Sequence, residues 1–256
     1  MDTPPSLEVP IPILFQTPLV HTTHPTVVAA IQRASRELGT FVLDRTEALD
    51  GLLQLDDRDS VLSDIERIKV QYPNCIAVVR VPLTAECIDR VEALVRSGVE
   101  VIHLAAHWDG LCEDGTSLSE ALPLVHQHLV AANRRDEVTL VASGGIAAAE
   151  HVPKAIILGA DGVVIDLPLL AALECPLLDA CFDGKPCPTP LDTITVKWGQ
   201  QRIVNLMAAW RNQLLEVLGA MGMREVRRLR GERGRAMFAQ DLSSKLFEPL
   251  FVTSQE

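Results

Sequence analysis

The sequence predicts an α/β fold, a (β/α) barrel of the TIM type, and three observations lead to it. Short, near-continuous apolar runs alternate with amphipathic stretches, as in parallel sheets covered by helices on both faces. About seven such units follow one another, close to the number in a closed barrel. The chain has 256 residues, and a complete barrel takes about 250. Because the last part of the chain has another pattern, we expect a shortened barrel.

Apolar runs mark the strands in order: 12–17, 40–44, 52–55, 75–81, 99–106, 138–143 and 162–166. Amphipathic stretches mark the helices between them: 24–39, 60–72, 84–98, 119–135 and 147–158. Gly39 closes the first helix and Pro73 stops the second, while Gly144-Gly145 ends the sixth strand. Residues 45–75 carry fewer strands than a full barrel needs, so the shortening is expected between strands two and five.

The C-terminal part is strongly helical over 197–238. One face carries apolar residues at helical spacing: Ile203, Leu206, Met207, Trp210, Leu214 and Leu218. We therefore expect two units, a barrel over 1–190 with a cysteine-rich loop at 174–190, and a helical extension over 191–256 packed on it. The arginine run from Arg224 to Arg235 is expected to form a solvated or partner-facing surface.

The net charge of −11 argues against nucleic acid or an anionic membrane surface as a partner. No apolar run reaches the roughly 18–20 residues of a membrane span. The start, MDTPPSLEVPIPILF, has no basic segment followed by a long apolar one, so we expect no signal peptide and a cytoplasmic location. In that compartment clustered thiols bind metal or do redox work more often than they form disulfides.

The stretch ECPLLDACFDGKPCPTP places Cys175, Cys181 and Cys187 at even intervals of five intervening residues. Two interpretations stay open from spacing alone: thiolates that converge on an iron–sulfur core, which needs several soft anionic ligands, or three reduced thiols in a loop. Of the other cysteines, Cys75 and Cys87 are expected to be small buried hydrophobes. Cys112 lies in a loop with no evident partner, and its exposure stays open.

The run VTLVASGGIAAAEHVPKAIILGADGVVIDLPLLAALEC resembles the FMN-binding barrel domain of glutamate synthase. In that family a glycine pair ends a strand, GAD opens the next strand, and a leucine-rich helix leads into an iron–sulfur cysteine cluster. The resemblance extends to Cys187-Pro188, to the helix QRIVNLMAAWRNQLLEVLGAMG and to the first strand, PILFQTPL. It covers most of 10–235 and is specific from 138 to 220. The second gap between the cysteines is five residues here and usually four in the family.

The resemblance implies cofactors and site residues. It implies a three-iron 3Fe-4S cluster on Cys175, Cys181 and Cys187. It implies FMN contacts from six positions: Gln16, Thr17, Arg80, Ser143, Gly144 and Gly145. AHWDGLCEDGTS stands in place of the family's His-Asp-Gly-Gly loop, which makes His107 and Asp109 the catalytic candidates. It also implies a small-molecule substrate and partner subunits that donate electrons and supply ammonia.

The sequence departs from the family where the flavin phosphate should bind. The family has Gly-x-Gly after its last strand, whereas this chain has Val164 and Asp166, and Ala147 replaces an arginine. Arg80 is one position off the expected basic residue, which on a strand means the opposite face. Two functions therefore stay open: a flavin and iron–sulfur oxidoreductase acting on 2-oxo acid and amino-acid chemistry, or a non-catalytic degenerate barrel that keeps at most an iron–sulfur cluster. A phosphate-binding isomerase or aldolase barrel is a third possibility, which the missing phosphate loop disfavours.

Overall fold

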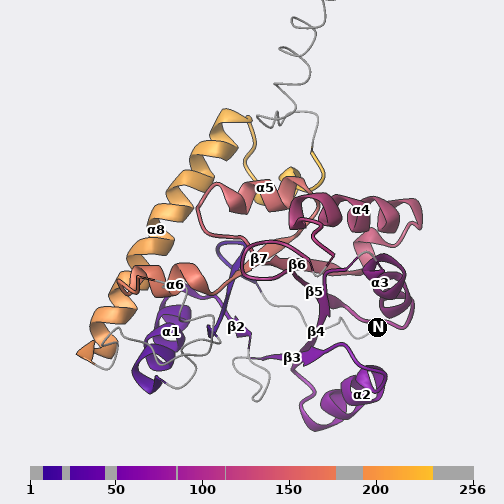
Figure 1. Ribbon diagram of the computed structural model, residues 1–256, viewed down its shortest axis with the longest axis horizontal. Helices are drawn as coiled ribbons and strands as arrows, with labels where there is room; N and C mark the ends of the chain where they lie inside the picture. The colour runs from indigo at the N-terminus through magenta and orange to yellow at the C-terminus, as the bar shows by residue number, and fades with distance from the viewer. Residues whose placement is uncertain are drawn as a thin grey trace, which may run out of the picture.

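The computed structural model describes residues 8–18, 24–43, 51–84, 86–112, 114–176 and 193–232. In these residues seven parallel strands form one curved sheet with helices around it (Figure 1). The strands are β1 (Ile13–Gln16), β2 (Val42–Leu43), β3 (Leu52–Asp56), β4 (Ile76–Pro82), β5 (Val101–Ala105), β6 (Thr139–Ser143) and β7 (Gly162–Ile165). Every expected strand is present.

The order of the strands is β2-β1-β7-β6-β5-β4-β3, so the last strand pairs with the first. β2 and β3, at the two ends of this order, lie close together but form no ladder within the described residues. The sheet is therefore a nearly closed barrel. Only residues 44–51 connect β2 to β3, and a crossover helix between parallel strands needs about a dozen residues or more. The prediction of a shortened (β/α) barrel is confirmed.

Six helices follow the remaining strands in turn: α1 (Pro25–Leu38), α2 (Val61–Gln71), α3 (Cys87–Arg96), α4 (Leu118–Ala131), α5 (His151–Ile157) and α6 (Leu167–Ala172). Their ends have local causes. α1 begins at a proline and ends at Gly39, whose φ of 67° is in the left-handed region. At the start of α4 the Glu120 carboxylate accepts the Ser117 amide N–H at 2.9 Å, which forms half of a capping box.

Two separate apolar layers follow from the alternation of side chains along each strand. One layer faces the barrel interior: Leu14, Leu43, Leu52, Ile76, Val78, Val141 and Val164. The larger layer lies between the strands and the surrounding helices. A residue two positions after a member of the interior layer also faces the interior. This parity places Gln54, Arg80 and Ser143 inside the barrel.

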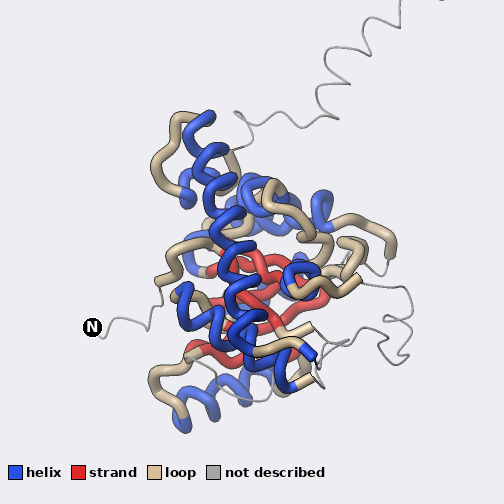
Figure 2. Tube along the Cα trace, turned by 90° about the vertical axis from the view of Figure 1, so that its left-hand side faces the viewer, coloured by secondary structure: helices blue, strands red, loops and turns tan. Residues whose placement is uncertain are grey.

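The long helix α8 (Val196–Ala220) runs beside α1 and α6 on one side of the barrel (Figure 2). Its buried residues include Ile203, Met207 and Trp210, which belong to the core outside the barrel. A Cβ on Gly199 would lie 2.9 Å from Ala30 Cβ, so the absence of a side chain lets α8 approach α1. Among the described residues no helix has both the length and the apolar composition needed to cross a membrane.

Candidate functional site

The carboxyl-terminal end of the barrel carries a layer of polar side chains directed inward. In barrels of this type this end bears the ligand and catalytic groups. The layer consists of residues from four strands of the wall: Gln54, Asp56, Arg80, His103 and Ser143. It lies just above the apolar interior. Gln54, Arg80 and Ser143 each stand two positions after a residue of the interior layer on the same strand.

His103 links β3 to β6 through the barrel interior. Its Nδ1 lies 2.7 Å from Gln54 Oε1, and its Nε2 lies 2.7 Å from Ser143 Oγ. The His103 side chain is 0% exposed and that of Gln54 is 1% exposed, whereas Ser143 is only partly buried. The result is a hydrogen-bonded chain that starts in the dry interior and ends at the mouth.

Neither Gln54 nor His103 was among the residues expected in the site. Both sit inside apolar runs, LLQL and VIHL, and a polar residue there is the signal that sequence reasoning could have used. A buried polar side chain needs a hydrogen-bonding partner, so two such residues in strands of one barrel predict a contact across its interior.

Arg80 faces the barrel interior, and the expectation that it lies on the opposite face is wrong. On β4 it has the same parity as Ile76 and Val78, which belong to the interior layer. Its Nη1 lies 3.9 Å from Asp56 Oδ1, and both side chains are about a quarter exposed, at 26% and 29%. The register also sets Arg80 directly beside His103 on the neighbouring strand. The cation therefore stands in the polar layer.

The glycine pair after β6 is required by packing against the neighbouring loop. Gly144 and Gly145 have φ values of 100° and 67°. A Cβ on Gly144 would lie 2.5 Å from His107 O, and one on Gly145 would lie 2.9 Å from Gly110 Cα. The Gly145 amide donates to Trp108 O at 3.2 Å. Close approach of the β5–α4 loop thus explains both glycines without any phosphate.

His107 and Asp109 lie in that same β5–α4 loop. His107 Nδ1 is 4.0 Å from Asp109 Oδ1, and the His107 side chain is 69% exposed. Asp109 also accepts the Leu111 amide N–H at 3.0 Å, which closes a local turn. The structure brings the two candidates together on the surface of the loop. Their catalytic role stays a prediction.

The two remaining residues that were expected to contact the flavin lie at the end of β1, and the residue that departs from the family's phosphate site lies at the end of β7. Gln16 is the last residue of β1 and Thr17 follows it; both are partly buried. At the end of β7 the Asp166 carboxylate accepts the Leu167 amide N–H at 2.6 Å and so caps α6. Burial raises the pKa of Asp166 above its ordinary value, against the lowering effect of this hydrogen bond.

Only one of the three cysteines expected to bind iron belongs to the described residues. Cys175 follows α6 and is 5% exposed, whereas Cys181 and Cys187 lie outside the described residues. Within the described part of the chain no three His, Cys, Asp or Glu side chains form a metal-binding group. Cys75 and Cys87 are buried as expected, and Cys112, whose exposure the sequence left open, is buried as well.

The opposite, amino-terminal end of the barrel contains a cavity of about 780 Å³. Interior residues such as Leu14, Val78 and Val141 line it, and its rim includes Asp161 and Arg230. In this fold the amino-terminal end serves stability rather than chemistry. The size of the cavity is therefore weaker support for a functional site than the chemistry of the polar layer at the other end.

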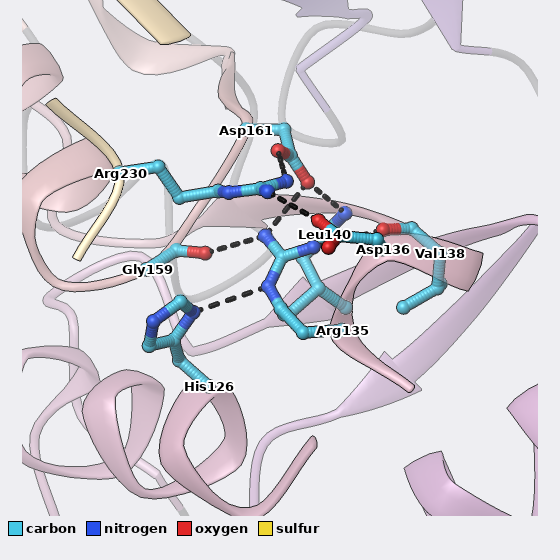
Figure 3. A network of polar contacts seen from close by, with 8 residues as sticks. All are labelled: His126, Arg135, Asp136, Val138, Leu140, Gly159, Asp161 and Arg230. Atoms are coloured by element: carbon cyan, nitrogen blue, oxygen red, sulfur yellow. Dashed lines mark hydrogen bonds and ion pairs between the residues drawn. The ribbon is translucent and has the colours of Figure 1, made fainter. Parts of the chain in front are cut away.

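A charged network closes the side of that amino-terminal end (Figure 3). Arg135, in the 3₁₀ turn η2 (Arg135–Glu137), donates to Asp161 Oδ2 at 2.8 Å and to His126 Nδ1 at 3.1 Å. Arg230 follows the turn η4 (Val226–Leu229) and donates to Asp161 Oδ1 at 2.8 Å and to Asp136 at 2.6 Å. Arg230 thus departs from the expected solvated surface and ties the segment after α8 to the barrel.

Comparison with known proteins gives matches to glutamate synthases over about half of this chain. A family model described as "Conserved region in glutamate synthase" matches residues 79–224. The archaeal glutamate synthase [NADPH] of Methanocaldococcus jannaschii is 34% identical over 128 residues, which are 47% of this chain and 25% of that protein. The Archaeoglobus fulgidus protein of the same name is 31% identical over 155 residues, 55% of this chain and 30% of that protein. The matched region is thus less than a third of either relative.

Solved structures agree on the fold. A mutant flavocytochrome b2 with pyruvate bound superposes with a TM-score of 0.64 at 14% identity, over 98% of this chain and 76% of that one. A mandelate oxidase mutant with a monooxide FMN adduct gives a TM-score of 0.55 at 16% identity, over 87% and 79% of the two chains. At these identities the likeness establishes the barrel alone. The family match covers more than half of the chain, from the fourth strand through α8, and this chain therefore belongs to the glutamate synthase family.

Proposed function

We propose that this chain is a barrel domain or subunit of a glutamate synthase-type oxidoreductase, with 2-oxo acid and amino-acid chemistry at the carboxyl-terminal mouth. One observation carries the proposal: Arg80 points into the mouth, beside His103 and within reach of Asp56. A guanidinium at this position can bind the carboxylate of a 2-oxo acid through paired hydrogen bonds. Asp56 would hold Arg80 in place until the substrate carboxylate arrives.

The residues that surround the mouth would have separate tasks. Arg80 would bind and orient the acid group, and Ser143 would contact the nitrogen-bearing part of a ligand. His107 and Asp109, on the loop above, would exchange protons with the substrate, as a histidine near neutral pH can. The loop packs directly on Gly144 and Gly145, so its position relative to Ser143 is fixed by the backbone.

FMN would supply hydride transfer if it were bound, but its phosphate group does not fit the residues present. The first amide of α6, which could bind a phosphate in a barrel of this type, already donates to the Asp166 carboxylate at 2.6 Å. The Gly145 amide is taken by Trp108 O. A carboxylate at the phosphate position would also repel a dianion. The fit therefore fails at one end of the cofactor.

An iron–sulfur cluster on Cys175, Cys181 and Cys187 is the second cofactor that we propose. Three thiolates suit a three-iron core, and Cys175 is shielded from solvent at the end of α6. Electrons would come from a partner subunit, and ammonia from a second one. Both partners are inferred from the family, because the relatives are about three to four times longer than the part of this chain that matches them.

The alternative is a non-catalytic, degenerate barrel that keeps at most an iron–sulfur cluster for structure or electron relay. The capping of α6 by Asp166 favours it. Anaerobic purification followed by an absorption spectrum and assays of iron, sulfide and flavin distinguishes the two. Stoichiometric flavin supports the oxidoreductase. Iron with sulfide but no flavin supports the alternative. The absence of all three contradicts the oxidoreductase and leaves only a scaffold. Exchange of Asp166 for glycine should raise FMN affinity, and no gain would remove the repulsion argument.

A further inference from the structure

Among the described residues, the end of β3 has backbone pairing on one side only. The strand forms a ladder with β4 alone and stands at one end of the strand order. A strand with a single partner is held by half the usual number of ladder bonds, so its end needs another anchor to keep a fixed position. Asp56, the last residue of β3, belongs to the polar layer and lies against Arg80. Whatever fixes the end of β3 therefore also fixes the surroundings of Arg80.

Two consecutive carboxylates at this end belong to opposite faces of the sheet, because side chains alternate along a strand. Asp56 has the parity of Leu52, which belongs to the interior layer. Asp57 has the parity of Leu55, which packs against the core between the strands and the helices. The Asp57 amide also continues the ladder, since it donates to Arg80 O at 3.0 Å. Asp57 therefore joins the helix layer through its side chain and the mouth cation through its main chain.

Arg90 of α3 holds the Asp57 carboxylate with three hydrogen bonds. Its Nε donates to Oδ2 at 2.8 Å and to Oδ1 at 3.1 Å, and its Nη2 donates to Oδ1 at 2.6 Å. The Asp57 side chain is only 13% exposed. A planar guanidinium that meets both oxygens of a shielded carboxylate fixes its orientation as well as its distance. Arg90 Nη2 also donates to Arg58 O at 3.5 Å. Arg90 thus anchors the chain directly after β3 to a helix.

We propose that Arg90 is a positioning residue of the mouth. It holds the end of β3 from the helix layer, so that Asp56 and Arg80 keep their places on the interior side. The inference rests on the proposed function, in which Arg80 binds the carboxylate of a 2-oxo acid. A displacement of about 1 Å, caused by a change far from the reacting atoms, can reduce a rate about 100-fold. Loss of the Arg90 anchor should therefore be measurable at Arg80.

The contact can be weakened from either side. Arg90→Gln removes the charge and the planar fork, whereas Arg90→Lys keeps the charge but cannot bond both carboxylate oxygens in one plane. Asp57→Asn changes the partner. The effects of Arg90→Gln and Asp57→Asn should not add in the double variant, because each breaks the same contact. Arg96→Gln is the matched control, since Arg96 stands on the same helix but pairs with Glu92 of that helix.

The first measurement follows Arg80 by NMR in the full chain without ligand. The protein is labelled with ¹⁵N-arginine, and the Nε–H signal of Arg80 is identified by its loss in Arg80→Lys. Arg90→Gln should shift or broaden this signal, Arg90→Lys should do so less, and Arg96→Gln should leave it unchanged. An unchanged Arg80 signal in folded Arg90→Gln would overturn the proposal. If Arg90→Gln does not fold, an unchanged signal in both Arg90→Lys and Asp57→Asn would overturn it.

The second measurement is calorimetric titration with 2-oxoglutarate, which serves as the 2-oxo acid probe. The wild type and Arg96→Gln should bind it with the same dissociation constant, and Arg90→Gln should bind it about 10–100-fold more weakly. If Arg90→Gln binds the probe as tightly as the wild type, Arg90 has no positioning role. Absence of binding by the wild type would instead contradict the proposed function, and the Arg80 signal would then decide the role of Arg90.

Discussion

Arg135 and Asp161 form an ion pair at the side of the amino-terminal end of the barrel: Arg135 Nη2 donates to Asp161 Oδ2 at 2.8 Å, and Arg135 is only 5% exposed. Oδ2 also accepts the Leu140 amide N–H, and Oδ1 accepts Arg230. Burial lowers the pKa of Arg135, and the cost of burying its charge is offset chiefly by this one carboxylate. A single side chain therefore connects η2, β6 and the segment after α8.

Asp161→Asn should be strongly destabilising. It removes the countercharge of a buried guanidinium, and the loss of one partner of such a pair costs about 3–5 kcal/mol. Urea unfolding gives the change in the free energy of unfolding. Asp136→Asn is the matched control, because the Asp136 side chain contacts the same Arg230 but is 89% exposed; its cost should stay below about 1 kcal/mol. Equal costs for the two variants would contradict the role given to Asp161.

Gly144→Ala should disturb the β5–α4 loop. The new Cβ would lie 2.5 Å from His107 O, a backbone atom that can move only with the loop. Gly98→Ala is the control, since Gly98 also has positive φ, 83°, but has no atom within 4 Å of the added Cβ. The control should cost about 1–2 kcal/mol from backbone strain alone. Gly144→Ala should cost more and should speed hydrogen exchange in residues 106–112; similar costs and unchanged exchange would show that the loop adapts.

Asp166→Asn should stabilise the protein at neutral pH. Burial raises the pKa of Asp166, so the folded state binds this proton more tightly than the unfolded state does. The stability it contributes is therefore present at low pH and is lost as pH rises through the raised pKa. Asparagine keeps an oxygen for the Leu167 N–H and removes the charge. Its advantage over the wild type in thermal unfolding should be largest near pH 7–8 and vanish on acidification.

Glu120→Gln should show the opposite pH dependence of stability to Asp166→Asn and can be measured over the same pH range. Hydrogen bonds from Ser117 lower the pKa of Glu120, so its contribution is present above its unfolded pKa and is lost as pH falls. The variant should be less stable than the wild type at neutral pH and should converge with it in acid. As pH rises, the stability of the Asp166 variant relative to the wild type should increase and that of the Glu120 variant should decrease. If both relative stabilities changed in the same direction, the account of the two environments would be wrong.

The three buried thiols outside the 174–190 loop should react slowly. Burial raises the pKa of Cys75, Cys87 and Cys112, and only the thiolate is nucleophilic. Iodoacetamide pulses at pH 8, read by peptide mass spectrometry, should label these three positions only when urea unfolds the chain. Rapid labelling of Cys112 in the native protein would mean that the loop around it opens.

The strands and helices followed from sequence because both signals are local. Apolar runs of strand length are separated by amphipathic stretches, and Gly39 ends its helix where the pattern stops. Which side of a strand faces the interior was harder to predict, since both faces of a buried parallel strand are apolar. Arg80 was placed on the opposite face because it stands one position off the family's basic residue, and its parity with Val78 shows that it faces the interior.

Contacts between residues far apart in the sequence could not be predicted, because the sequence pattern is local. Gln54 and His103 are 49 residues apart, and Arg230 and Asp161 are 69 apart. Nothing local distinguishes Arg230 from the other arginines of its run. Cys112 lies in a polar loop, a pattern that does not indicate how far its thiol is buried, and the structure shows the residue to be only 8% exposed.

The contact between Gln54 and His103 joins two strands that share no ladder. Among the described residues β4 lies between β3 and β5 in the sheet, yet Gln54 Oε1 and His103 Nδ1 are 2.7 Å apart. In barrels of this type alternate strands supply the side chains of one interior layer. The polar layer therefore ties second-neighbour strands together from inside, which the backbone hydrogen bonds between adjacent strands do not do.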